Sequence, residues 1–139
     1  MTAPAHILLV EDDPALAELT RFALGDFDVD LSHASTGAAA LARAAAPPPP
    51  RLVLLDLDLP DMRGFEVLDG IRGGAAGHAI PVVVLSSSEE EADLARAATG
   101  GANSYVVKPA EFEAFRDTVR RTVSYWLELH RPLAAEGTP

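Results

Sequence analysis

Residues 54–61, LLDLDLPD, place three aspartates at the end of an apolar run that begins at Leu52. The apolar residues before them are typical of a strand that is buried on both faces. Like charges crowded at a strand end repel one another, and burying them without a partner is costly. The stretch therefore indicates a buried strand with aspartates at its carboxyl end. Not all three aspartates need to be functional residues.

Short apolar runs and helix-like segments alternate on both sides of this stretch. Strands are expected at residues 6–10, 28–33, 52–57, 80–86 and 103–108. Helices are expected from Pro14 to about Gly25, from Thr36 to the four prolines at 47–50, and at residues 64–72, 89–98 and 110–129. Strands that alternate with helices predict parallel βαβ units and a doubly wound α/β sheet.

In such a sheet the functional site lies outside the carboxyl ends of the strands. The residues that follow the first, third, fourth and fifth predicted strands are, in order, Glu11 and Asp12, Asp56, Ser86 and Ser87, and Lys108 and Pro109. Three carboxylates in one place repel unless a cation lies among them, and Mg²⁺ prefers such hard oxygen ligands. A carboxylate can also attack phosphorus to form an acyl phosphate. The pattern predicts Mg²⁺-dependent phosphoryl chemistry, with Lys108 and Ser86 able to contact phosphoryl oxygens.

Composition limits the class of protein. A chain of 139 residues predicts one domain. Its formal net charge of −10 argues against unaided binding to nucleic acid or to an anionic membrane. The sequence has no cysteine, no long apolar run and no basic residues before its first apolar stretch, so disulfides, a membrane span and a signal peptide are not expected. A cytoplasmic protein is the default expectation.

The quoted blocks resemble a known family. ILLVEDDP, LLDLDLPDMRGFEVL, IPVVVLSS and GANSYVVKP are similar to the conserved blocks of the receiver domain of two-component response regulators, over about residues 5–128. The resemblance implies a flavodoxin-like (βα)5 fold with strand order 2-1-3-4-5. It also implies a single receiver domain over residues 1–139, with a core at about 5–129 and a flexible tail at 130–139.

The resemblance implies a role for each acid. Asp56 matches the phosphorylated aspartate, and Glu11 and Asp12 match the acidic pair, with Asp12 as the more direct Mg²⁺ ligand. Asp58 is expected to offer its backbone carbonyl to the metal, while its side chain, like that of Ser88, occupies a position that tunes phosphoryl lifetime. Asp61 matches no site residue, and we interpret it as a solvated turn residue.

The resemblance further implies a switch. Ser86, with Ser87 beside it, is expected to move toward the phosphoryl group from a resting state in which only solvent contacts it. Tyr105 would turn into the space that this movement opens, and Lys108 would pair with the phosphoryl oxygens. Pro109 follows that lysine and is often joined to it by a cis peptide in this family. The face built by the predicted helix at 89–98, the fifth strand and the last helix would then change shape.

The expected partners are proteins. The resemblance implies a sensor histidine kinase as phosphoryl donor, a downstream protein target, no nucleic acid and no membrane. The ending SYWLELHRPL is similar to single-domain regulators partnered with bacterial phytochromes, which suggests a bacteriophytochrome as the kinase. Residues Phe115, Trp126 and Leu127 on the last helix are candidates for a homodimer contact, with core packing as the alternative.

Two other functions fit parts of the sequence. A receiver-like interaction module could have the fold and never take phosphate. A haloacid-dehalogenase-type phosphatase would use Asp56 as nucleophile and Asp58 as acid/base, but such enzymes carry this motif on their first strand. We therefore expect a phosphoacceptor signalling protein, not an enzyme in the ordinary sense.

Overall fold

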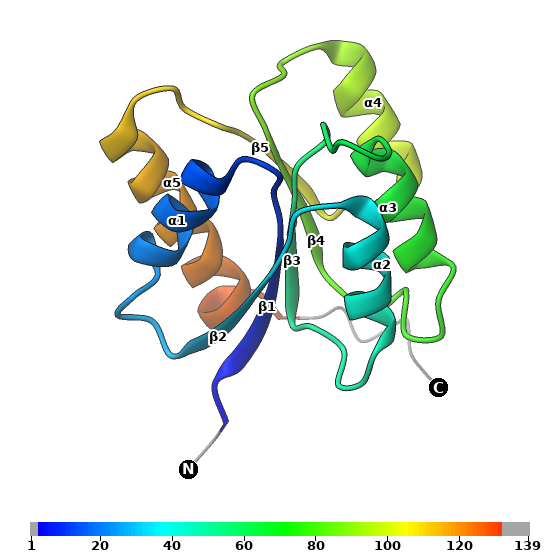
Figure 1. Cartoon of the computed structure of the whole chain (residues 1–139), viewed down its shortest axis with the longest axis horizontal. Coiled ribbons are helices and arrows are strands. Elements are labelled where there is room, and N and C mark those ends of the chain that lie inside the picture. The colour runs from blue at the N-terminus through cyan, green and yellow to red at the C-terminus, as the bar shows by residue number, and fades with distance from the viewer. Residues whose placement is uncertain (1–2, 132–139) are drawn as a thin grey trace.

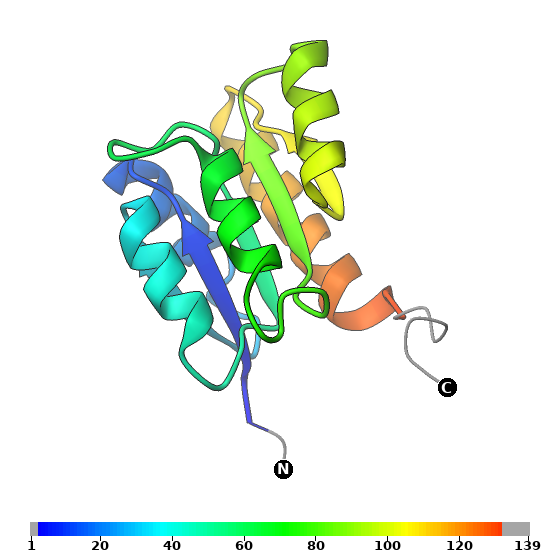
Figure 2. The same cartoon turned by 90° about the vertical axis from the view of Figure 1, so that its right-hand side faces the viewer.

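The computed structural model of the chain describes residues 3–131 and contains a five-stranded parallel sheet between two layers of helices (Figure 1, Figure 2). The strands are β1 (Ala5–Val10), β2 (Val29–Ala34), β3 (Leu52–Leu55), β4 (Val82–Ser86) and β5 (Ser104–Val107). The helices are α1 (Pro14–Ala23), α2 (Gly37–Ala45), α3 (Gly64–Arg72), α4 (Glu91–Gly100) and α5 (Phe112–Ser124), which continues as a π-helical turn, Tyr125–Leu129. Figure 1 shows α1 and α5 on one side of the sheet and α2, α3 and α4 on the other.

The strand order is β2-β1-β3-β4-β5, and every neighbouring pair is parallel. The predicted flavodoxin-like fold and strand order are confirmed. β1 lies between β2 and β3, so that Val10 at its end pairs with both Ala34 and Leu55. This register determines the site, because it sets the residues that follow β1 and β3 side by side.

The core lies on both faces of the sheet, which explains why the strands read as continuous apolar runs. Successive side chains of a strand point to opposite faces. Ile7 and Leu9 of β1 accordingly pack with α1 and α5, whereas Leu8 and Val10 pack with α2 and α3. Full burial of each such side chain contributes about 1.5–3 kcal/mol, so neither face tolerates a polar substitution.

Local caps set where the first two helices begin. The Asp13 carboxylate accepts hydrogen bonds from the backbone N–H groups of Ala15 (2.9 Å) and Leu16 (3.3 Å), and Pro14 occupies the first helical position. The Thr36 hydroxyl accepts from the N–H of Ala39 at 3.1 Å. Both helices start at a side chain that satisfies otherwise unpaired amides.

The last helix differs from its predicted form at both ends. The helix begins at Phe112, two residues later than predicted, and Phe112 in its first turn is 44% exposed. Phe115 is 3% exposed and belongs to the core beneath α5. Of the two alternatives considered for Phe115, its burial favours core packing over a partner contact. Trp126 and Leu127 are partly buried against the same core.

Of the tail predicted at 130–139, residues 132–139 lie outside the described part of the chain. At its start, the N–H of His130 donates to the carbonyl of Tyr125 at 2.7 Å. The His130 ring also packs on Trp126, with 4.3 Å between the ring centroids. Within residues 3–131, no helix has the length and apolar character needed to cross a bilayer.

Candidate functional site

Strand register gathers the predicted site residues at the carboxyl edge of the sheet. Val10 pairs with Leu55, so Glu11 and Asp56 follow at neighbouring positions. Ser86 pairs with Val107, which places Lys108 next in line on the adjacent strand. The backbone holds this edge together, since the Asp56 N–H donates to the carbonyl of Val10 at 3.0 Å.

Three acids at this edge form a cluster of oxygen ligands. Glu11, Asp12 and Asp56 each offer a carboxylate oxygen, and these oxygens lie within 4.8 Å of one another. Glu11 is 3% exposed and Asp56 is 8% exposed, whereas Asp12 lies at the surface. Buried and exposed carboxylates around one point suit a divalent cation that keeps some of its water ligands, as Mg²⁺ does.

Lys108 is the cation that the structure places among the buried acids. Its Nζ donates to Glu11 Oε1 at 2.7 Å and lies 3.6 Å from Asp56 Oδ1. The Lys108 side chain is almost wholly buried, like its two partners. One lysine therefore serves two carboxylates, which leaves an excess of negative charge in the cluster.

Burial of the cluster alters the ionisation of Asp56. Burial raises the pKa of Asp56 to about 6; Lys108 opposes this rise and the negative charge of Glu11 adds to it. Burial disfavours the charged form of a carboxyl group because the interior solvates ions poorly. The site is thus arranged to be stabilised by additional positive charge at the carboxylates.

The loop after β4 holds Ser86 and Tyr105 in a defined arrangement. The buried Ser86 hydroxyl accepts a hydrogen bond from the N–H of Ser88 at 3.1 Å. The Tyr105 hydroxyl donates to the carbonyl of Ser88 at 2.9 Å. The expectation that only solvent contacts Ser86 is wrong, because the chain turns after β4 and brings the Ser88 amide back onto it. Ser87 is exposed.

Asp58 and Pro109 are the remaining predicted site residues. Asp58 has a side chain that is 75% exposed and pairs with Arg63, a residue that the sequence had not singled out. The peptide between Lys108 and Pro109 is trans, contrary to the frequent cis form; within residues 3–131 the cis peptide joins Pro47 and Pro48.

Asp61 is not merely a solvated turn residue, and that interpretation is corrected. Its Oδ1 accepts from the N–H of Gly37 at 2.8 Å and its Oδ2 from the N–H of Ala38 at 3.0 Å. These backbone hydrogen bonds lower the pKa of Asp61. Asp61 thereby ties the loop after Asp56 to the start of α2. One signal did exist, because the first turn of α2 contains no acid of its own to complement the helix dipole.

We predict that Asp61→Ala destabilises the fold at neutral pH, because two helix amides lose their carboxylate partner. A carboxyl group whose pKa is lower in the folded state than in the unfolded state stabilises the protein at pH values above its unfolded-state pKa. This stabilisation is lost as the pH falls through the folded-state pKa. The deficit of the variant in urea midpoint should therefore be full at neutral pH and shrink below pH of about 4. Asp28→Ala is the control, because no such pH-dependent loss is expected for it. Equal losses in urea midpoint for the two variants would contradict the role of Asp61 at the start of α2.

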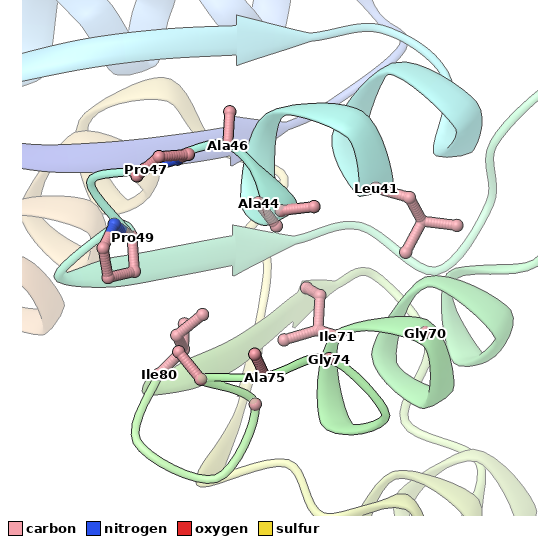
Figure 3. Close-up of a pocket in the computed structure, with 13 residues that line it drawn as sticks. Leu41, Ala44, Ala46, Pro47, Pro49, Gly70, Ile71, Gly74, Ala75 and Ile80 are labelled. Atoms are coloured by element: carbon pink, nitrogen blue, oxygen red, sulfur yellow. The ribbon is translucent and has the colours of Figure 1, made fainter.

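An apolar cavity lies at the opposite edge of the sheet from the acids. It has a volume of about 440 Å³ and opens between the C-terminal ends of α2 and α3 (Figure 3). Its lining consists of Ala, Gly, Pro, Leu and Ile residues, among them Leu41, Pro47, Ile71 and Ile80. No group there can ionise or donate from a side chain, so the chemistry belongs to the carboxylate cluster despite the size of this cavity.

Comparisons with known proteins show the family to which the chain is similar. The family model described as "response regulator receiver domain" matches residues 7–120. A probable methanogenesis regulatory protein of Methanothrix harundinacea, FilR2, is 42% identical over 136 residues, which cover 92% of this chain and 87% of that protein. Two regulators of Mycobacterium tuberculosis that also match are longer, and the aligned part spans about half of each (56% and 51%).

Two solved structures are similar over nearly the whole chain. The phosphorylated cyanobacterial phytochrome response regulator RcpA superposes with a TM-score of 0.86 at 33% identity and covers 93% of this chain and 98% of its own. The Mn²⁺-bound response regulator Rcp1 gives a TM-score of 0.83 at 34% identity, with 94% and 100% covered. These likenesses concern a phosphorylated protein and a metal-bound protein of the same fold.

Proposed function

This chain belongs to the response regulator receiver domain family, and from that membership we propose that Asp56 accepts a phosphoryl group from a histidine kinase. The observation that carries the proposal is the carboxylate cluster of Glu11, Asp12 and Asp56 with Lys108 among its buried members. The family belongs to two-component signalling. The choice of Asp56, the requirement for Mg²⁺ and the identity of the partners are parts of the proposal.

The proposed chemistry uses Asp56 as the nucleophile. A carboxylate oxygen of Asp56 forms a bond to phosphorus, the bond between phosphorus and the donor atom breaks, and the donor leaves with that electron pair. Mg²⁺ held by Glu11, Asp12 and Asp56, with the Asp58 carbonyl as a further ligand, would neutralise phosphoryl oxygens. Lys108 is within reach of Asp56 and can pair with an oxygen of the transferred group. Charge neutralisation and positioning account for most catalysis of phosphoryl transfer.

The proposed output is a change in the loop after β4. A phosphoryl group on Asp56 adds acceptor oxygens, toward which the Ser86 hydroxyl can donate. Because Ser88 is bonded to both Ser86 and Tyr105, movement of Ser86 disturbs the contact that holds the Tyr105 hydroxyl. The domain would then shift between two arrangements whose populations depend on phosphorylation.

The surface that reports this change is proposed to be the face of α4, β5 and α5. It carries large exposed apolar side chains, namely Leu94, Val107, Phe112 and Tyr125. Such side chains favour a protein partner, either a downstream target or a second copy of the chain. The likeness to RcpA, a phytochrome response regulator, supports a kinase of the phytochrome type as donor. We further propose that residues 3–131 act as one receiver domain.

The function is tested with acetyl phosphate. Incubation of the protein with acetyl phosphate and Mg²⁺ is expected to add one acid-labile phosphoryl group per chain, measured by intact-protein mass spectrometry. Chelation of divalent cations should reduce this uptake to background, because the carboxylates then lack the charge that attracts the phosphoryl group. Absence of uptake with Mg²⁺ would favour a phosphorylation-independent interaction module. Repeated turnover of p-nitrophenyl phosphate would instead indicate a phosphatase.

A further inference from the structure

Arg63 lies between the acceptor loop and the loop that holds the switch residues. Its Nε is 3.6 Å from Asp58 Oδ1 and donates to the carbonyl of Leu57 at 3.3 Å, both in the loop directly after Asp56. Its Nη2 is 3.7 Å from Asp93 Oδ1, in the first turn of α4. One guanidinium therefore joins two segments that are far apart in the chain.

Asp93 continues the connection toward the switch. Its Oδ2 accepts a hydrogen bond from the Ser88 hydroxyl at 2.6 Å, and its side chain is 19% exposed. Ser88 in turn donates its N–H to Ser86 and accepts from the Tyr105 hydroxyl through its carbonyl. Contacts thus run without interruption from Asp58 through Arg63, Asp93 and Ser88 to both Ser86 and Tyr105.

Packing holds the Arg63 side chain in place. Its guanidinium lies over the ring of the buried Phe65, 5.2 Å from the ring centroid, and the backbones of Asp58 and Arg63 form an isolated antiparallel bridge. A side chain that is already stacked loses little further freedom when it forms ion pairs. The planar fork of arginine can also contact two partners at once, which a lysine ammonium at this place could not do in the same geometry.

We infer that Arg63 is a positioning residue that restrains the loop after β4 in the resting arrangement, an inference that rests on the proposed phosphorylation of Asp56. Movement of Ser86 toward a phosphoryl group must carry Ser88, and with it the hydroxyl that Asp93 holds. The Arg63–Asp93 pair opposes that movement as long as Arg63 stays bound to the acceptor loop. The two positions expected to tune phosphoryl lifetime, Asp58 and Ser88, are therefore coupled through Arg63 and Asp93.

The strength of the restraint can be estimated from the solvent exposure of the Arg63–Asp93 ion pair. Partly exposed ion pairs are modest in strength, and their loss changes an equilibrium constant by about two- to fivefold. A ligand that binds only one of two arrangements has an apparent affinity reduced by the fraction of protein in that arrangement. Loss of the restraint should therefore raise the apparent affinity for beryllofluoride, and the rate of phosphorylation by acetyl phosphate, by about the same factor.

The experiment compares Arg63→Gln, Asp93→Asn and the double variant with the wild type. Phosphorylation by acetyl phosphate with Mg²⁺ is followed by mass spectrometry, and beryllofluoride binding by the NMR resonances of Tyr105. Each single variant is expected to show a gain of about two- to fivefold, and the double variant no more than either single one, because one contact is removed in all three. Arg63→Lys should retain part of the restraint.

Arg96→Gln is the matched control. The Arg96 guanidinium also lies 5.2 Å from the centroid of the Phe65 ring and pairs with Asp69 at 3.2 Å, but it contacts neither Asp58 nor Asp93. It should leave the phosphorylation rate and the Tyr105 resonances unchanged. A purely structural role of Arg63 would lower the thermal midpoint without altering either readout.

The outcomes separate the inference from the proposed function. Absence of phosphate uptake by the wild type overturns both. Uptake by the wild type with no change in Arg63→Gln overturns the inference alone. A gain in Arg63→Gln that Asp93→Asn does not reproduce also overturns it, because the effect then comes from the charge of Asp58 and not from the bridge. Gains in both single variants that multiply in the double variant would equally exclude a shared contact.

Discussion

The Asp56→Asn variant is expected to take up no phosphoryl group and, without divalent cations, to resist urea better than the wild type. The first effect follows because an amide cannot act as the nucleophile that forms the acyl phosphate. The second follows because the asparagine side chain has nearly the same shape as that of aspartate and no charge to bury beside Glu11. Acetyl phosphate labelling and urea unfolding at several pH values measure the two effects on the same samples.

The pH dependence of the second effect has a defined sign. Burial raises the pKa of Asp56 to about 6 in the folded state, above its ordinary value near 3.8. The folded protein therefore binds more protons than the unfolded chain between these values, and the wild type loses stability as pH rises through them. The advantage of Asp56→Asn should be full above pH of about 6 and vanish below about 4. Allowing for solvent screening, it should amount to about 1–3 kcal/mol.

Asp58→Asn is the matched control for this result. Asp58 lies only two residues after Asp56, but its side chain is mostly exposed. Replacing it with the uncharged asparagine should therefore not increase the stability of the protein. Addition of Mg²⁺ should also narrow the difference between Asp56→Asn and the wild type, since the metal offsets the charge repulsion. An Asp56→Asn variant that is less stable than the wild type at every pH would contradict the proposed electrostatics.

Gly64→Ala is expected to destabilise the protein by about 2–3 kcal/mol and to impair phosphorylation. A Cβ at this position would collide with the carbonyl oxygen of Asp56 and lie 2.8 Å from the Cα of Leu57. Both are backbone atoms of the acceptor loop, which side-chain rotation cannot move aside. Relief of the collision must displace the backbone that carries Asp56, so the urea midpoint and the phosphorylation rate should fall together.

Gly73→Ala provides the comparison for Gly64→Ala. At Gly73 an added Cβ would meet its nearest atom, the carbonyl oxygen of Asp69, at 3.5 Å, which is ordinary contact. The backbone there has φ of −81°, which alanine adopts freely. This variant should remain within about 0.5 kcal/mol of the wild type. Equal losses in the two variants would show that glycine flexibility, and not the space beside Asp56, is what matters.

The fold and the site acids were predictable from the sequence because both follow from strand pattern. Runs such as LVLL mark strands buried on both faces, and the residues just past each run meet at one edge of a parallel sheet. Glu11, Asp56 and Lys108 needed no further information to be placed together. The helix caps Asp13 and Thr36 were also readable, because each bonds to amides within three residues of itself.

The roles of Asp61 and Arg63 were not predictable in this way. Asp61 bonds to the N–H of Gly37, 24 positions earlier in the chain, and Arg63 bonds across to α4. Exposed charged residues in a loop show no periodicity, and their partners depend on how two loops pack once the sheet has formed. The same applies to Phe112 and Phe115, which lie three residues apart on α5 but differ in burial, because only Phe115 packs in the core beneath the helix.

The sequence by itself thus determined the alternation of strands and helices and the acids and lysine at the carboxyl edge, because hydrophobic patterns are local and the residues just past each parallel strand meet at one edge. The strand order was expected from the resemblance to receiver domains, not from the pattern itself. Only the tertiary structure decided how the acceptor loop is anchored to α2 through Asp61 and to α4 through Arg63. These contacts join segments whose separation in the chain carries no local signal, and they are the contacts that can adjust the response of Ser86 and Tyr105 to Asp56.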